Sequence, residues 1–308
     1  MKHRTQTHHS NTRSITMERS NQPIEPNLEV GEAAGLLEQA QDVSNNTMPT
    51  TDQTSHDHDT DQALQEWRQL LVRWQLAASL LAHALSLLMA LLVAWWVHLL
   101  GGLSWSKGNS KHVFNWHPLL MILAFGFMNV AALSFRFSCY NQNYSRATKK
   151  WIHGSSWAVA LIFGMVALIA VFKSHNDKMS GFISNLYSFH SWLGLGVVGL
   201  YALQFLAGFF GFAWNVFGFT PFTKAKLLTL HSFLGPFLHM AVAATIMSGI
   251  QEKEGFVNCS YKVDEADLWP IYHFGLIPKP CIASHLLGLC VLASALCTSF
   301  ALHKFGSN

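Results

Sequence analysis

The chain has 308 residues, of which 50% are hydrophobic and only 12% are charged, against about 25% charged residues in ordinary soluble domains. This composition excludes a simple soluble fold, and a net charge of +3 without a dense basic patch excludes a typical nucleic-acid-binding protein. The five cysteines are scattered and form no CxxC pair, so a disulfide scaffold and a zinc or thioredoxin-type motif are excluded as well.

The first 66 residues differ in composition from the rest of the chain. They are rich in Ser, Thr, Asn, Gln, Asp and Glu, and too few large apolar residues are present to offset the entropy lost on ordering. We therefore expect a disordered polar tail over residues 1–66 and a membrane domain over residues 67–308. The first apolar run begins only near Trp74, which indicates a signal anchor rather than a cleaved secretory signal.

Six apolar runs follow, and each is long enough for one bilayer crossing of about 20 residues. Since helices satisfy their own backbone hydrogen bonds in lipid, the runs predict an all-α membrane protein with six transmembrane helices. The expected helices cover residues 74–103, 115–135, 151–172, 186–216, 227–251 and 281–303.

Four histidines, His117, His153, His190 and His231, each open one of these runs, with spacings of 36, 37 and 41 residues. That spacing corresponds to one crossing and one connection, so successive histidines alternate between the two membrane faces. His117 then lies above the membrane midplane with His190, and His153 lies below it with His231. Neutral imidazole is a good haem-iron ligand, and polar side chains at membrane depth face the bundle interior. The pattern predicts a central four-helix bundle that holds two bis-histidyl b haems.

Glycine follows His190 and His231 by four residues, as Gly194 and Gly235, which would let a flat porphyrin edge approach the helix backbone. Glycine also serves ordinary helix packing in membranes, so this feature alone does not discriminate. The remaining helix histidines are interpreted as packing residues, although one of them lies two turns beyond His231 on a similar face. These histidines are His83, His98, His239 and His285.

Basic residues in the connections give the orientation. The face with the chain termini carries nine Lys and Arg residues and the other face seven, which favours cytoplasmic N- and C-termini. Cys259 and Cys281 then share one connection on the oxidising side, where either a disulfide or two free thiols is compatible with the sequence.

Three strings resemble the cytochrome b561 family: Asn115–Met121, Thr148–Gly154 and Asn185–Gly194. The resemblance covers about residues 75–304. Members of this family are six-helix, two-haem proteins that pass electrons from cytosolic ascorbate to an acceptor across the membrane. The resemblance implies that His117 and His190 ligate the non-cytoplasmic haem, that His153 and His231 ligate the cytoplasmic one, and that the protein is a homodimer.

The same resemblance implies two substrate sites. Ascorbate is an anion and needs a cationic landing site; the candidates beside the cytoplasmic haem are Lys150, Lys149, Arg136, Lys224 and Lys226. On the opposite face Phe172, His175 and Tyr187 resemble the acceptor site, although the stretch between His175 and Tyr187 is about three residues longer than in the usual pattern. Lysine also stands at 224 and 226 where the family commonly has arginine.

The sequence thus predicts an ascorbate-dependent transmembrane reductase with ferric chelate or monodehydroascorbate as acceptor. One alternative keeps both haems but takes electrons from a quinol or a flavoprotein. Another is a haem-free transporter in which the histidines relay protons. The sequence does not distinguish plasma membrane from endomembrane.

Overall fold

The computed structural model describes residues 51–136, 144–214, 218–257, 259 and 277–303. Residues 64–308 form one compact unit, to which the following description applies. The described part contains no β-strand. Its helices are α2 (Thr51–Leu99), α3 (Ser110–Phe114), α4 (Trp116–Leu133), α5 (Arg146–His175), α6 (Phe189–Gly208), the π-helix η1 (Phe209–Ala213), α7 (Pro221–Phe256) and α8 (Lys279–Leu302).

Six helices are long and apolar enough to cross a membrane, which confirms the predicted fold class. The spans are 60–99, 110–133, 146–175, 189–213, 221–256 and 279–302. The expected disordered tail stays a prediction, since residues 1–50 lie outside the described residues; helix α2 begins at Thr51.

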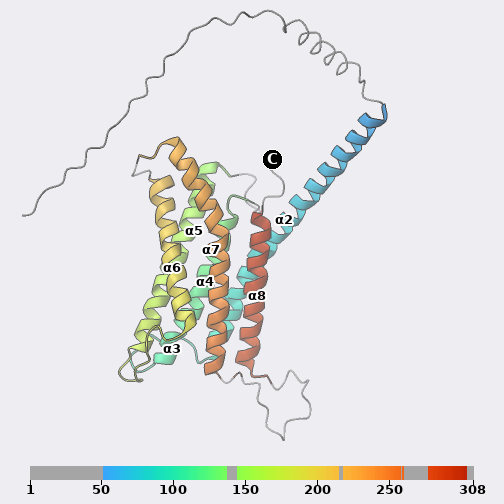
Figure 1. Ribbon diagram of the computed structural model, residues 1–308. Helices are drawn as coiled ribbons and strands as arrows, with labels where there is room; N and C mark the ends of the chain where they lie inside the picture. The colour runs from blue at the N-terminus through green and yellow to red at the C-terminus, as the bar shows by residue number, and fades with distance from the viewer. Residues whose placement is uncertain (1–50, 137–143, 215–217, 258, 260–276, 304–308) are drawn as a thin grey trace, which may run out of the picture. The chain divides into compact units, whose positions relative to one another are not determined.

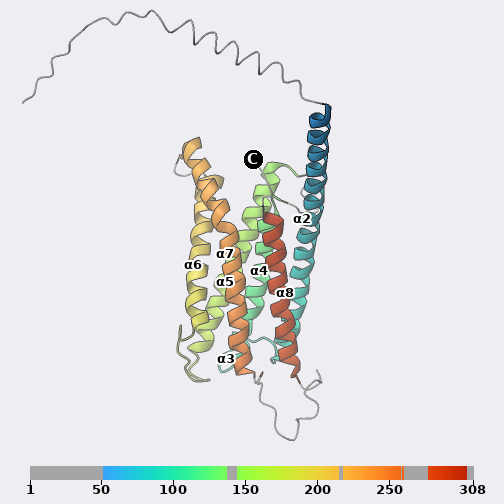
Figure 2. The same ribbon diagram turned by 45° about the vertical axis from the view of Figure 1, so that its right-hand side comes forward.

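Helix α7 lies between α6 and α8 in both views of the bundle (Figure 1 and Figure 2). Helix α3 lies at the end of the bundle where α6 and α8 begin, and we call this the α3 end. Helices α5 and α7 begin at the other end, which we call the Lys150 end after a residue in the first turns of α5.

A buried polar network joins α4 to α2 and α8. The Asn129 amide of α4 donates to Ser86 Oγ at 2.9 Å and to Ser294 Oγ at 2.8 Å, while the Thr298 hydroxyl donates to the Asn129 carbonyl oxygen at 3.0 Å. Because buried polar groups are costly unless paired, this network fixes the mutual register of the three helices.

Side-chain caps explain where three of the spanning helices begin. Ser145, Ser188 and Thr220 each stand just before a helix and accept a hydrogen bond from the backbone N–H three residues on. Such caps satisfy amides that have no partner within the helix. As a result α5 and α7 begin well before the predicted limits of 151 and 227, so His153 and His231 lie two to three turns inside their helices rather than at their starts.

The fourth predicted helix, 186–216, is not a continuous α-helix. Helix α6 begins at Phe189 and continues after Gly208 as η1, whose five residues form a π-helix. A Cβ on Gly211 would lie 2.7 Å from Leu227 Cδ2 of α7. Glycine therefore permits this segment to approach α7 more closely than a longer side chain would.

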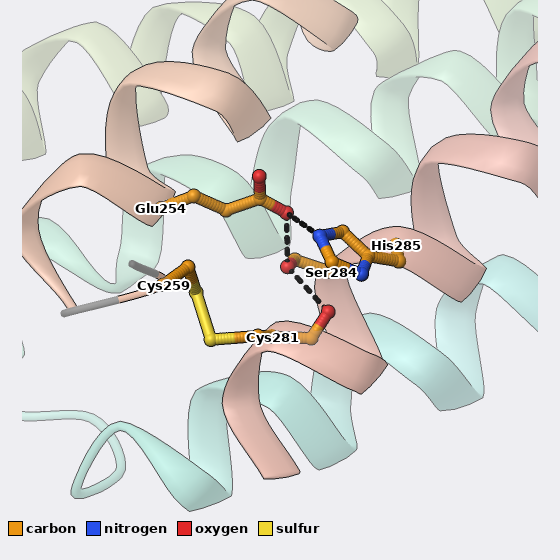
Figure 3. Close-up of a disulfide and its surroundings, with 5 residues drawn as sticks. All are labelled: Glu254, Cys259, Cys281, Ser284 and His285. Atoms are coloured by element: carbon orange, nitrogen blue, oxygen red, sulfur yellow. Dashed lines mark hydrogen bonds and ion pairs between the residues drawn. A yellow bond between two sulfur atoms is a disulfide. The ribbon is translucent and has the colours of Figure 1, made fainter. Parts of the chain in front are cut away.

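Cys259 and Cys281 form a disulfide, with their Cα atoms 5.8 Å apart, which decides between the two alternatives left open by the sequence (Figure 3). The bond ties the segment after α7 to the first turn of α8 at the α3 end. Beside it, Ser284 donates to the Glu254 carboxylate, and His285 Nε2 lies 3.3 Å from the same carboxylate oxygen.

Candidate functional site

The first histidine pair lies at the α3 end. His117 and His190 are the second residues of α4 and α6, and their ring centroids are 6.1 Å apart with the ring planes at 81°. His190 Nδ1 lies 3.0 Å from the Thr245 carbonyl oxygen of α7, and His117 Nδ1 lies 3.4 Å from the Ala167 carbonyl oxygen of α5. Four helices therefore position these two rings.

The second pair lies toward the Lys150 end. His153 of α5 and His231 of α7 also have ring centroids 6.1 Å apart, with the ring planes at 64°. His153 Nδ1 is 2.8 Å from the Ala131 carbonyl oxygen at the end of α4. His231 Nδ1 is buried and has no hydrogen-bond partner.

The two pairs lie at different depths in the bundle. His117 and Ala131, which contact different pairs, are separated by 14 residues of α4, as are His231 and Thr245 in α7. At 1.5 Å per residue each separation corresponds to about 20 Å along the helix axis. The same spacing on two different helices places the pairs one above the other.

The separation within each pair fits two imidazoles on opposite sides of one metal ion. Two metal–nitrogen bonds of about 2 Å each, and roughly 1 Å from each nitrogen to its ring centre, span about 6 Å. Where Nδ1 donates to a carbonyl oxygen, Nε2 carries the free lone pair and faces the partner ring. The described residues contain no group of three or more His, Cys, Asp or Glu side chains suited to a free metal ion. The site therefore fits a metal that arrives with its own equatorial ligands, as in haem.

Close backbone approach helps to position two of these rings. A Cβ on Gly249 of α7 would lie 2.6 Å from His190 Cε1, and a Cβ on Gly208 of α6 would lie 3.3 Å from His231 Cε1. The sequence analysis had singled out Gly194 and Gly235 instead. A Cβ on Gly194 would make only an ordinary contact with Thr245, and a Cβ on Gly235 would meet no atom within 4 Å.

A cavity of about 900 Å³ opens at the α3 end and reaches His117 and His190. Phe172, His175 and Tyr187 also line it, so the longer stretch between His175 and Tyr187 does not move His175 away from the cavity. The His175 ring stacks on Phe114 with centroids 6.3 Å apart.

Tyr187 closes one side of this cavity through an acidic partner. Its hydroxyl donates to Glu252 Oε1 at 2.7 Å. Burial and this carboxylate raise the pKa of Tyr187 to about 12, so the phenol keeps its proton throughout the physiological range.

The predicted basic residues gather near the Lys150 end. Lys149 and Lys150 lie in the first turns of α5, and Lys150 is exposed. Lys224 and Lys226 lie in the first turns of α7, with Lys226 Nζ 4.4 Å above the Phe222 ring. Arg136 lines a smaller cavity of about 530 Å³ together with residues of α7 and α8.

His239, the strongest competitor of His231 in the sequence, belongs to neither pair. It is fully buried and stacks on Phe125 of α4, with ring centroids 4.9 Å apart and the planes at 15°. This packing role is the one that the sequence indicated.

Two further cavity-lining residues, Lys111 of α3 and Lys253 of α7, were not singled out from the sequence. Lys253 stands between Glu252 and Glu254, and the sequence gives no sign that both acids turn to other partners.

The fold and the site define a class: a six-helix membrane protein with two imidazole pairs stacked at two depths, suited to carrying electrons. A model of the eukaryotic cytochrome b561 family matches residues 116–257. The chain is 34% identical to transmembrane ascorbate ferrireductase 1 of Arabidopsis thaliana over 184 residues, covering 59% of this chain and 74% of the relative.

Two other relatives point to the same family. The chain is 36% identical to the probable ascorbate-specific transmembrane electron transporter 1 of Oryza sativa subsp. japonica, over 58% of this chain and 74% of the relative. It is 39% identical to the plasma membrane ascorbate-dependent reductase CYBRD1 of Xenopus laevis, over 58% of this chain and 60% of the relative. The chain therefore belongs to the cytochrome b561 family, and it is a transmembrane oxidoreductase.

Proposed function

We propose that this protein passes single electrons from cytosolic ascorbate, through two b haems, to an acceptor on the other side of the membrane. The observation that carries the proposal is the pair of 6.1 Å imidazole separations at two depths of one bundle. The relatives named for ascorbate-dependent electron transfer support the choice of donor.

His117 and His190 would hold one haem, and His153 and His231 the other. A haem with two axial imidazoles supplies a reversible one-electron couple and leaves no open position for a ligand. The chain's contribution is orientation: backbone carbonyl oxygens of Ala167, Thr245 and Ala131 accept from Nδ1 of three histidines and keep each Nε2 free for the metal.

At the Lys150 end, the basic residues would bind the ascorbate anion. Lys150 lies three residues before His153 on the exposed start of α5, and Lys149, Arg136, Lys224 and Lys226 add positive charge nearby in the sequence of their helices. The ascorbate monoanion gives up one electron, loses a proton to water, and leaves as the monodehydroascorbate radical anion.

At the α3 end, the cavity beside His117 and His190 would receive the acceptor. Phe172, His175 and Tyr187 line it, and its opening lets a small molecule approach the imidazole pair. Ferric chelate or monodehydroascorbate would take up one electron there.

We place the chain termini and the Lys150 end in the cytoplasm. The basic residues of that end support this orientation. The Cys259–Cys281 disulfide at the α3 end supports it independently, because disulfides persist in oxidising compartments. Homodimerisation stays a prediction from the family resemblance.

Proteoliposomes loaded with ascorbate test the proposal. With a ferric chelate outside, the wild-type protein should show reduced b-haem absorption and should form ferrous iron outside. Reduction by a quinol or by a flavoprotein, but not by ascorbate, would favour the second di-haem reading. A purified protein without a haem band would leave the transporter reading.

A further inference from the structure

Two lysines from different helices meet at the cavity of the α3 end. Lys111 belongs to the short helix α3 and Lys253 to the last turn of α7, and both line the cavity that reaches His117 and His190. In the sequence they counted only toward the charge of one membrane face.

The positive charge of this lysine pair is concentrated on an aromatic surface. Lys253 Nζ lies 4.5 Å above the centroid of the Phe114 ring, whose plane is parallel to His175 within 8°. Lys111 is close enough for its ammonium group to repel that of Lys253. Lys253 is partly buried, so solvent screens this repulsion less than it would at an open surface.

The neighbouring acids do not neutralise the pair. Glu252 accepts the hydrogen bond from the Tyr187 hydroxyl, and Glu254 is engaged with Ser284 and His285. Within the described residues, the carboxylates lie more than 4.0 Å from the amino groups of both lysines. Two ammonium groups without a counter-charge thus flank one cavity.

Like charges in a partly enclosed cleft focus the electric field and attract an ion of opposite sign. We infer that Lys111 and Lys253 form an anion-binding subsite for the electron acceptor, which is therefore a multiply charged anion such as a ferric polycarboxylate. Charge-assisted hydrogen bonds from two ammonium groups suit the free carboxylate oxygens of such a chelate. The inference rests on the proposed function, since it names the class of acceptor for the same cavity.

The reaction at this subsite is a simple one-electron reduction. The ferric centre of the bound chelate takes one electron and becomes ferrous, and no bond to a protein residue forms or breaks. The chelate leaves with one more negative charge, and no proton transfer is needed for charge balance in this step.

The competing explanation is that both lysines only anchor helix ends at the membrane surface, with their amino groups reaching water. In that role their charge would influence anionic and cationic acceptors alike. The two explanations therefore differ in how the rate depends on the charge of the acceptor.

The experiment compares the wild type with the double variant Lys111→Gln/Lys253→Gln in ascorbate-loaded proteoliposomes at low ionic strength. Ferricyanide, a trianion, and hexaammineruthenium(III), a trication, are added outside as one-electron acceptors. We expect the double variant to lower kcat/KM for ferricyanide about tenfold, mainly through KM, and to leave the ruthenium complex unaffected or faster. Lys178→Gln, an exposed lysine of the same end outside the cavity lining, should change neither rate.

An equal loss with both acceptors, or no loss with ferricyanide, would overturn the inference. Calorimetric binding of hexacyanochromate(III), a trianion of the same shape that accepts no electron, supplies a second measurement. The wild type should bind it about tenfold more tightly than the double variant, and equal binding would also overturn the inference. Wild-type vesicles that transfer no electrons contradict the proposed function, whereas the calorimetric comparison still decides on the lysine pair.

Discussion

The two ends of the bundle treat the same pair of imidazoles differently. At the α3 end, His117 and His190 line a cavity of about 900 Å³ walled by aromatic residues. At the Lys150 end, exposed cations stand on the first turns of helices, and His231 Nδ1 is buried without a partner. Equal spacing within the pairs indicates a common ligand chemistry, and the different surroundings indicate that each end meets a different molecule.

This asymmetry makes direction a property of the surroundings rather than of the histidines. A cavity can hold and orient an acceptor close to the imidazoles, whereas exposed basic residues can only attract a donor to the surface. The following predictions test the comparison, beginning with the largest expected effect.

His153→Ala should abolish electron transfer across the membrane, because a single remaining imidazole pair serves only one of the two depths. Haem absorption from the pair at the α3 end should persist, since His117 and His190 contact other parts of α5 and α7. The measurement is ferrous iron formation outside ascorbate-loaded vesicles, together with the difference spectrum. His98→Ala, an exposed histidine at the end of α2, is the matched control and should behave as wild type.

Gly249→Ala should weaken only the pair at the α3 end. The added Cβ would lie 2.6 Å from the His190 ring, so the ring must move from the geometry that the Thr245 carbonyl oxygen fixes. We expect haem affinity at this pair to fall about tenfold or more, measured as haem retained on dilution. Gly199→Ala on the same bundle, where a Cβ meets no atom within 4 Å, should retain both haems; a similar loss there would refute the positional explanation.

Lys150→Gln should affect the donor and not the acceptor. Loss of one exposed charge should raise KM for ascorbate about two- to fivefold, the range of exposed ionic contacts. The haem spectrum and the KM for the acceptor should stay unchanged. If Lys178→Gln at the opposite end raised KM for ascorbate equally, the assignment of donor and acceptor ends would be wrong.

Replacing Cys259 and Cys281 by serine should have the smallest effect on electron transfer. The bond closes a connection with a sequence separation of 22 residues, and its removal should lower the free energy of unfolding by about 2 kcal/mol. Thermal unfolding measures this loss, with the double serine variant of the free cysteines Cys290 and Cys297 as control. Haem reduction by ascorbate at the Lys150 end should be unchanged.

The sequence predicted the six spans because membrane crossings depend on length and apolarity alone, which are local properties. It also predicted which histidines lie at the same depth, since one crossing reverses direction. It could not predict that α5 and α7 begin at the caps Ser145 and Thr220, because polar first turns resemble loops in a hydropathy pattern.

The closer details of the site depend on contacts between helices. Gly249 is distant from His190 in the sequence, and only the packing of α6 on α7 shows that a side chain there would collide with the ring. Likewise Lys253 is flanked by two acids in the sequence, and their engagement with Tyr187 and Ser284 is a property of the folded chain.

The central claim is that the four histidines act as two separate pairs, and the haem content of double alanine variants tests it most directly. His117→Ala/His190→Ala removes both members of one pair and should leave one haem per chain. His117→Ala/His153→Ala removes one member of each pair and should leave none bound by two imidazoles. Equal haem content in the two variants would contradict the pairing and the electron-transfer function built on it.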